Sequence, residues 1–202
     1  MATSEVDIAN IALTQVGAAT INAFTESSPE AKNANILYPA SRDTVLRMHP
    51  WNSAIKRVKL SPVTGGTPPF DFENSFNLPA DCLRVLGVAQ AEDLTDVCHK
   101  VEGRTIVTDE GTIYLKYIHR VTDVSLMDAL LVEAIAHHLA WKLTVPLLEN
   151  ANKTQQAYGL FTQVMRQAKS VDAKEDSVTQ LEADVWTGAR TDYGFIPLRQ
   201  DR

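Results

Sequence analysis

Near the N-terminus, hydrophobic and polar positions follow the spacing of an amphipathic helix. Apolar residues recur at four-residue steps and predict one buried face: Ile8, Ala12 and Val16. Ser4 precedes this stripe and Asp7 follows Ser4 by three residues, a pair typical of the capping box that begins a helix. Gly17 marks the expected C-terminal end. We therefore expect a first helix between Ser4 and Gly17.

The same spacing predicts a second, longer helix. Ser28 is its expected cap, Pro29 occupies the first helical position, and the helix should end near Met48, before Pro50. The predicted buried face comprises Ala34, Tyr38, Ser41, Val45 and Met48. Three basic residues are predicted off that face: Lys32, Arg42 and Arg47.

The middle third of the chain changes to short β-type segments. Residues 55–60 alternate apolar and basic side chains, and a turn-rich stretch follows, SPVTGGTPPF. Four further strand-like segments lie between Cys82 and Ile118: CLRVLGV, DVCHKV, RTIV and TIYLKYI. The last places Ile113, Leu115 and Tyr117 on one face. Asp109, Glu110 and Gly111 predict a hairpin turn. Together these segments predict a small antiparallel sheet.

Helical spacing returns after the predicted sheet. Ser125 and Asp128 form another capping-box pattern, and the Leu- and Ala-rich helix that follows should be the most buried and should end at Pro146. A fourth helix is expected from about Glu149 to Val171. Its predicted buried stripe comprises Ala157, Leu160, Phe161, Val164, Ala168 and Val171.

Beyond Lys174 the periodicity is lost, but large apolar groups remain: Trp186, Tyr193, Phe195 and Ile196. A purely solvated tail seldom carries such residues, so we expect it to dock on its own domain or on a partner. The predicted fold class is α+β: a four-helix layer, a small antiparallel β-domain inserted between the second and third helices, and an extended C-terminal docking arm. The predicted parts are a helical part (1–50), a β-rich insertion (51–123), a second helical part that packs on the first (124–173) and the arm (174–202).

Composition narrows the function classes. The chain has 202 residues, 45% of them hydrophobic, and a formal net charge of -6. This acidic balance argues against a surface built throughout for nucleic acid, although Lys56, Arg57 and Lys59 leave a local basic patch open, either a phosphate contact or a solvated edge. The two cysteines are too few for a disulfide scaffold. No apolar run or leader pattern indicates membrane insertion or secretion, so folding in the cytosol is expected.

The histidines and glycines give little indication of cofactor chemistry. His137 and His138 are adjacent, about 100° apart around a helix, so a regular helix cannot aim both at one metal ion. Glu133 shares a face with His137, but no third ligand can be placed. Gly65-Gly66 lacks the following Lys-Ser/Thr of a phosphate loop. We expect no metal and no cofactor.

One carboxylate pair deserves comparison with glycan hydrolases. Asp71 and Glu73 lie in PFDFENSF, beside three phenylalanines that could line a sugar groove. Hydrolysis of a glycosidic bond needs two placed carboxyl groups. Ordinary loop chemistry explains the same residues, so we regard the protein as a non-enzyme, with a cell-wall glycan hydrolase as the alternative.

The stretch VLRMHPWNSAIKRVKL, Val45 to Leu60, joins the second predicted helix to the first predicted strand. Pro50 ends the helix and Trp51 follows at once. We interpret the pair as a structural corner, with the indole packed where the helical layer turns into the β-layer. His49 belongs to the helix ending in this interpretation and is not a general base.

Several strings resemble the tail tubular protein A family of short-tailed bacteriophages. They are Asn10-Ile11-Ala12-Leu13 with Gly17, SRDTVLRMHPWNSA (Ser41 to Ala54), FNLPADCLRV (Phe76 to Val85), YIHRVTD (Tyr117 to Asp123) and the Ala/Leu-rich helix from Ala129 to Leu143. The second and third strings are the more specific, because two unusual strings occur in order and at the right spacing. Ser53 departs from the family, which commonly has an aromatic residue there. The stretch after Lys174 matches least.

The resemblance implies a structural protein of the phage tail. About twelve copies would form a closed ring between the portal protein and the tail nozzle protein, and the ring would form part of the channel for genome ejection. Double-stranded DNA would pass through the lumen without sequence-specific binding. The protein would be assembled in the host cytoplasm and would end up in the virion. Neither catalysis nor a cofactor is implied.

Overall fold

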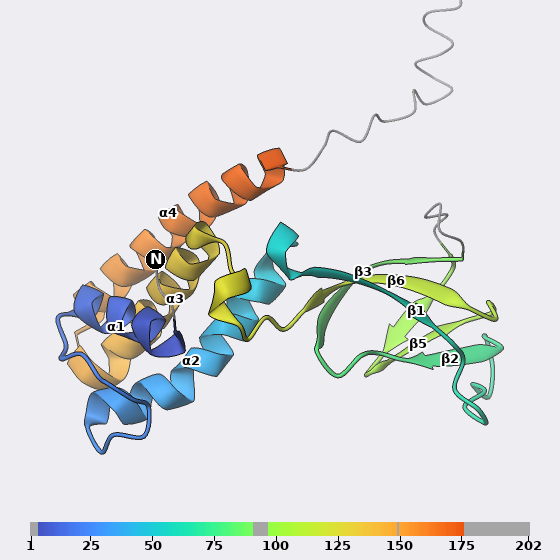
Figure 1. Ribbon diagram of the computed structural model, residues 1–202, viewed down its shortest axis with the longest axis horizontal. Coiled ribbons are helices and arrows are strands. Elements are labelled where there is room, and N and C mark those ends of the chain that lie inside the picture. The colour runs from blue at the N-terminus through green and yellow to red at the C-terminus, as the bar shows by residue number, and fades with distance from the viewer. Residues whose placement is uncertain (1–3, 91–96, 149, 176–202) are drawn as a thin grey trace, which may run out of the picture.

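A computed structural model describes residues 4–90, 97–148 and 150–175, and within them the chain is an α+β protein. The helices gather at one end and the strands at the other, with the C-terminal half of α2 reaching the junction (Figure 1). The helices are α1 (Glu5–Val16), α2 (Pro29–Met48), α3 (Ala129–Leu148) and α4 (Ala151–Glu175), with short 3-10 helices at Asn52–Ala54 (η1) and Val124–Leu126 (η2). The strands are β1 (Ile55–Leu60), β2 (Asn74–Asn77), β3 (Cys82–Ala89), β4 (Lys100–Glu102), β5 (Thr105–Thr108) and β6 (Ile113–His119).

The predicted ends of α1 are confirmed. The Ser4 hydroxyl accepts a hydrogen bond from the Asp7 backbone N–H at 3.1 Å, and the Asp7 carboxylate accepts one from the Ser4 N–H at 3.0 Å. Two otherwise unpaired N–H groups of the first turn are thereby satisfied. Gly17 ends the helix with φ 76°, a left-handed conformation that glycine adopts without steric cost.

Helix α2 also has its predicted bounds, but two of its side chains were misplaced. Met48 is 43% exposed, although we predicted it on the buried face. Arg42, predicted off that face, is buried. The reason is an ion-pair network between α1 and α2: the Arg42 guanidinium lies 3.0 Å from the Glu5 carboxylate and 3.1 Å from that of Asp43. Apolar periodicity alone does not reveal such a paired charge.

Helix α3 differs from prediction at both ends. Ser125 lies in the 3-10 turn, whose cap is Asp123, and the Asp128 carboxylate instead accepts from the Leu130 N–H at 2.8 Å. Pro146 does not end the helix, which continues to Leu148. A proline so near the C-terminus removes one helical hydrogen bond, a small cost for a helix whose long apolar surface is buried.

The buried stripe of helix α4 agrees only in part with the one predicted. Phe161 and Ala168 are buried as expected, but Leu160 and Val171 are 47% and 40% exposed. The buried positions are Phe161, Met165, Ala168 and Asp172, a stripe at steps of four, three and four residues. The predicted starting residue, Glu149, lies outside the described residues.

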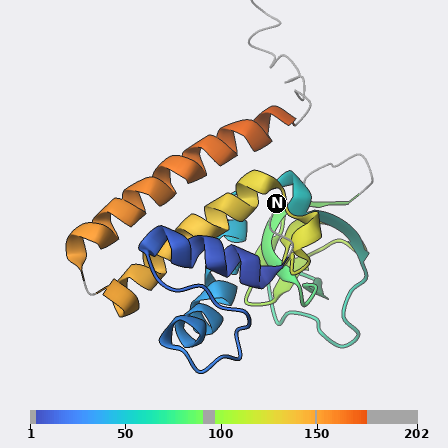
Figure 2. The ribbon, with the colours of Figure 1, turned by 60° about the vertical axis from the view of Figure 1, so that its left-hand side comes forward.

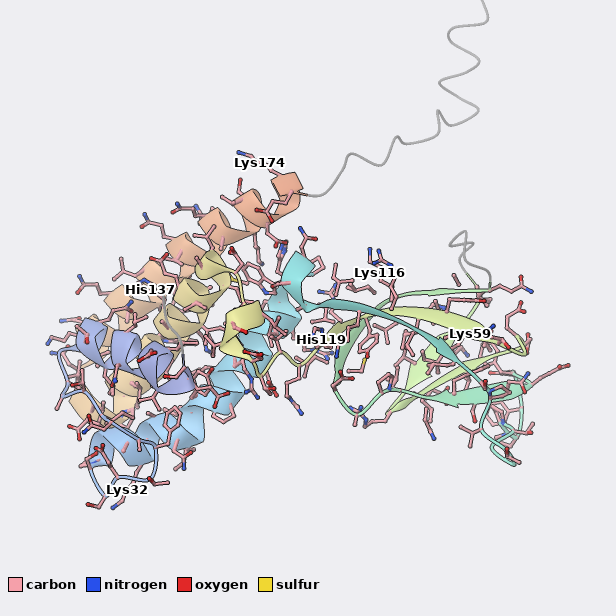
Figure 3. All side chains as sticks on the ribbon, in the orientation of Figure 1. Lys32, Lys59, Lys116, His119, His137 and Lys174 are labelled. Carbon is pink, nitrogen blue, oxygen red and sulfur yellow. The ribbon has the colours of Figure 1, made fainter. Side chains whose placement is uncertain are left out.

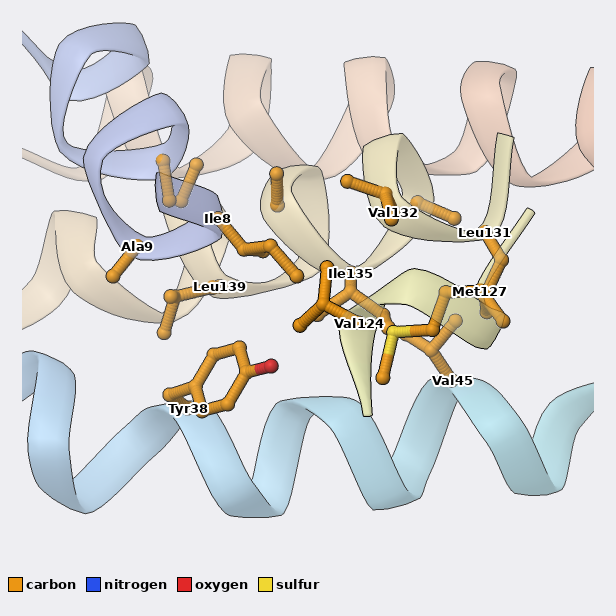
Figure 4. Packing of buried hydrophobic residues seen from close by; sticks show 14 of the residues in the cluster. Ile8, Ala9, Tyr38, Val45, Val124, Met127, Leu131, Val132, Ile135 and Leu139 are labelled. Carbon is orange, nitrogen blue, oxygen red and sulfur yellow. The ribbon is translucent and has the colours of Figure 1, made fainter. Parts of the chain in front are cut away.

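The helical core lies where α3 meets the three other helices. Side chains of α1, α2 and α3 converge in Figure 4, where Ile8, Tyr38, Ile135 and Leu139 are labelled. Figure 2 shows α4 lying along the outside of α3, away from α2. Burial of such large apolar side chains is the main stabilising contribution, roughly 1.5–3 kcal/mol each.

The β-layer contains two antiparallel three-stranded sheets where we expected one. Their strand orders are β1-β6-β3 and β2-β5-β4. Strand β2 was not predicted. Of the segment DVCHKV, only Lys100 and Val101 lie in a strand, β4, and its first residue, Asp96, lies outside the described part of the chain. Asp109–Gly111 is not a hairpin turn, because β5 and β6 belong to different sheets. It carries the chain from one sheet to the other.

The two sheets pack face to face around a second apolar cluster. As predicted, Ile113, Leu115 and Tyr117 share one face of β6, and they meet Phe76 and Ile106 from the other sheet. Ile118 points the opposite way and belongs to the helical core. Strand β6 therefore contributes to both cores and ties the layers together.

One histidine lies inside the helical core. His138 is 3% exposed, its ring contacts Trp141 and Phe161 edge-on, and its Nδ1 has no hydrogen-bond partner among the described residues. Burial lowers the pKa of His138 from 6.5 to about 4, and the nearby Lys142 ammonium acts in the same direction. The folded protein therefore holds this ring neutral.

We predict that His138 makes the protein sensitive to mild acid. Between pH 6.5 and 4 the unfolded chain binds a proton that the folded chain excludes, so the free energy of unfolding falls by up to about 3 kcal/mol from this group. Urea unfolding at several pH values measures the effect. In His138→Leu and His138→Gln this part of the fall should vanish. A pH dependence parallel to that of the native protein in both variants would contradict the assignment.

Candidate functional site

The corner between the layers begins where α2 ends. His49 is extended, with φ -144° and ψ 146°, the conformation that a residue before proline prefers. Pro50 follows, and Trp51 opens η1, whose first turn is closed by the Ala54 N–H donating to the Trp51 carbonyl at 2.9 Å. β1 starts at the next residue, Ile55. The chain thus changes from helix to strand within a few residues.

The Trp51 side chain is fully buried and belongs to the helical core. Its indole N–H donates to the Val45 carbonyl at 3.0 Å, in the last turn of α2, where carbonyls lack helical partners. The His49 ring meets the indole edge-on, with centroids 4.9 Å apart. The indole therefore both caps a free carbonyl at the end of α2 and fills the space at the junction of the two layers.

Asp172 of α4 holds the corner from the outside. Its carboxylate lies 3.0 Å from His49 Nε2 and accepts from the Asn52 N–H at 3.2 Å, while its backbone carbonyl accepts from the Asn52 side-chain amide at 3.0 Å. We call His49, Asn52 and Asp172 the corner clamp. The sequence carried a signal that we missed: an acid four residues after Ala168, on the apolar stripe of α4. The clamp fixes the last turn of α4 beside the start of β1.

The predicted docking residues Trp186, Tyr193, Phe195 and Ile196 lie outside the described residues. The described part of α4 ends at Glu175, one turn beyond the clamp.

The carboxylate pair lies at the far end of the β-layer. Asp71 and Glu73 are both exposed; the Asp71 carboxylate is 3.4 Å from the Lys100 ammonium, and the Glu73 N–H donates to the Asp109 carboxylate at 3.0 Å. Phe70 beside them is 74% exposed. Asp71 has φ 70°, a left-handed conformation that aspartate tolerates in tight turns. These contacts are those of an ordered loop that bears two solvated acids and an aromatic ring.

One face of the β1-β6-β3 sheet is basic. Register pairs Arg57 with Lys116 and Lys59 with Tyr114, so these side chains share the face opposite the β-core. Figure 3 shows Lys59 and Lys116 on the β-layer. The Lys59 ammonium lies 5.3 Å from the Tyr114 ring centroid, and Arg57 and Lys116 form no ion pair within residues 4–90, 97–148 and 150–175. Lys56 points the other way and pairs with Asp81 at 3.1 Å.

An apolar depression lies where α3 and α4 meet at their connecting turn. Its volume is about 550 Å³, and its walls include Trp141, Val145 and Tyr158. Val145 is 62% exposed and Tyr158 is 49% exposed. The Trp141 and Tyr158 rings are in contact, with centroids 4.9 Å apart and planes tilted by 54°. We call Trp141, Val145 and Tyr158 the hairpin patch. This surface was not predicted, because the Leu- and Ala-rich sequence of α3 indicated burial almost all round.

The remaining candidate ligands do not converge. His137 Nε2 lies 3.2 Å from the Gln15 amide and 3.8 Å from the Glu133 carboxylate, and burial lowers its pKa against the raising effect of Glu133. Within the described ranges, no three or more His, Cys, Asp or Glu side chains are placed to hold a metal ion. In the same ranges, no helix is long and apolar enough to cross a membrane.

We predict that the corner clamp stabilises the fold. Asp172→Ala removes the acceptor for His49 and for the Asn52 N–H, so the free energy of unfolding should fall by about 1.5–3 kcal/mol. Chemical unfolding followed by circular dichroism measures this. Glu175→Ala, an exposed acid in the same turn of α4, is the matched control and should change stability by less than about 0.5 kcal/mol. Equal effects of the two substitutions would refute the clamp.

Comparison with known proteins gives no independent assignment: no family model matches the chain, and no curated protein matches it.

Proposed function

We propose that this protein is a structural component of a bacteriophage tail. In this proposal about twelve copies form a ring that joins the portal protein to the tail nozzle protein and encloses part of the path of the DNA. The support is the resemblance of the sequence strings to the tail tubular protein A family. The ordered strings of that resemblance include the Trp51 corner, which the fold uses to join its layers. The function is mechanical, and the protein resides in the tail of the virion.

The observation that carries the proposal is the hairpin patch. Single exposed apolar residues are common, but a hollow with two adjoining aromatic rings and an exposed valine is typical of a contact surface. A ring of identical subunits uses two different faces of each subunit, one of which must receive the neighbouring copy. We assign the hairpin patch to that role. The Lys142 ammonium, 4.1 Å from the Trp141 ring centroid, supplies a polar rim.

The acidic net charge fits a channel through which DNA passes. The chain carries a formal charge of -6, so a ring whose lumen shares that balance would repel the DNA backbone and let it slide. The basic sheet face departs from this acidic balance.

We predict that a charge in the hairpin patch prevents ring assembly. Val145→Glu places a carboxylate on an exposed position, so the subunit should fold as before while self-association weakens by at least about tenfold. Mass by light scattering, on the protein alone and with portal protein added, measures this. The matched control is Ile36→Glu, because Ile36 is 71% exposed on α2, outside the patch. Rings of unchanged mass with Val145→Glu would remove the patch from the interface.

The alternative function is a cell-wall glycan hydrolase, either alone or added to the ring. The feature that favours it is the loop with Asp71, Glu73 and the exposed Phe70 ring. It predicts that Asp71→Asn combined with Glu73→Gln abolishes clearing of a cell-wall suspension by the native protein. Clearing that survives the double substitution, or a native protein without clearing activity, would contradict this alternative.

A further inference from the structure

A cavity of about 320 Å³ lies between the end of α2, strand β3 and the turn from β4 to β5. Three arginines line it, one from each of these elements: Arg47, Arg84 and Arg104. We call it the arginine cavity. The rest of its wall is mostly apolar and includes Leu78, Val85 and Val101.

Two local features of the chain bring the arginines together. Strand β3 has register irregularities on both sides of Arg84 and Val85, and such bulges re-aim the side chains that they contain. The β4–β5 hairpin turns on Gly103 and Arg104 alone, and Gly103 has φ 60°. A glycine at that position allows the tight turn that places Arg104 at the cavity.

Among the residues that the structure describes, the three guanidinium groups have hydrogen bonds only to backbone carbonyls. Arg47 donates to the Leu83 carbonyl, Arg84 to the Arg47 carbonyl at 3.4 Å, and Arg104 to the carbonyls of Pro79 and Cys82. None of the three lies in an ion pair within the described ranges. A guanidinium has five N–H donors, so the described part of the chain leaves most of these donors available to a ligand.

The ionisable groups nearest the cavity do not balance these charges. The Asp81 carboxylate is occupied by the Lys56 ammonium at 3.1 Å and by the Tyr117 hydroxyl at 3.2 Å. Cys82 lines the cavity, and burial raises the pKa of its thiol despite the nearby arginines, so the sulfur stays neutral. Glu102 is exposed at the end of β4 and forms no ion pair in the described part of the chain.

We propose that the arginine cavity binds a phosphate group. Arginine forks match the oxygens of phosphate, and a dianion offsets the three charges better than a single carboxylate does. The apolar wall provides a surface for the organic part of a phosphate ester, and the volume lies at the small end of the range for ligand pockets. The group comes either from a free phosphate ester or from the backbone of DNA.

The proposal does not depend on ring formation. Phosphate binding is measured on the dissolved protein whatever its mass, and the ring is measured by mass whatever it binds. Failure of either proposal is therefore distinguishable from failure of the other.

Isothermal titration calorimetry of the full chain with inorganic phosphate, at constant ionic strength, tests the site. We expect Arg84→Gln and Arg104→Gln each to weaken phosphate binding by about tenfold or more, because each removes a charged donor. Arg57→Gln, the same charge change on the β1 face, should leave the affinity within about twofold. Circular dichroism melting curves verify that the variants are folded. Absence of phosphate binding, equal loss in Arg57→Gln, or equal affinity for acetate would overturn the proposal.

A second titration with a short DNA duplex identifies the source of the phosphate. DNA binding that weakens in Arg84→Gln and Arg104→Gln but not in Arg57→Gln supports the phosphate site and assigns it to the DNA backbone. If Arg84→Gln and Arg104→Gln lose inorganic phosphate binding but bind DNA as the native protein does, the site is supported and its ligand is a free phosphate ester.

Discussion

The hydrogen bond from the Trp51 indole to the Val45 carbonyl is the interaction on which the two-layer arrangement depends. It closes the last turn of α2 at the point where the chain must leave the helices. The same ring is buried in the helical core, so its position fixes the direction in which β1 starts. Asp172 secures this corner from α4, and Ile118 of β6 reaches into the helical core beside it. Both layers are thus oriented by a few buried contacts at one corner.

Much of this fold is predictable from the sequence where local chemistry decides. Ser4, Asp7, Gly17, Ser28 and Pro29 set helix ends through hydrogen bonds and backbone preferences within a few residues, and those ends agree with the structure. The predictions were wrong where contacts between residues far apart in the sequence determine the structure. Arg42 is buried only because Glu5 from another helix reaches it, and α3 continues past Pro146 because its burial outweighs one lost hydrogen bond. The split into two sheets is likewise decided by packing between segments far apart in the sequence.

The candidate sites on the surface also differ in how far the sequence predicts them. The positions of Pro50 and Trp51 at the corner and the basic residues of β1 were predicted from the sequence. The corner clamp, the hairpin patch and the arginine cavity were not. Each of these is assembled from segments well separated along the chain: Asp172 with His49, Tyr158 with Trp141, and Arg104 with Arg47. The apolar hairpin patch lies on the helices and the basic surfaces lie on or beside the strands. A subunit of a heterologous ring needs two different contact faces, and more where the ring also joins two other proteins. The apolar and basic surfaces fit that requirement of the proposed ring.

Whether these faces build a ring can be seen by electron microscopy of the purified protein. Negatively stained particles are imaged with and without portal protein, and the rotational symmetry is counted in top views. We expect closed rings of about twelve subunits around a central hole, formed alone or templated by the portal. Particles that stay monomeric in the presence of the portal would contradict this expectation.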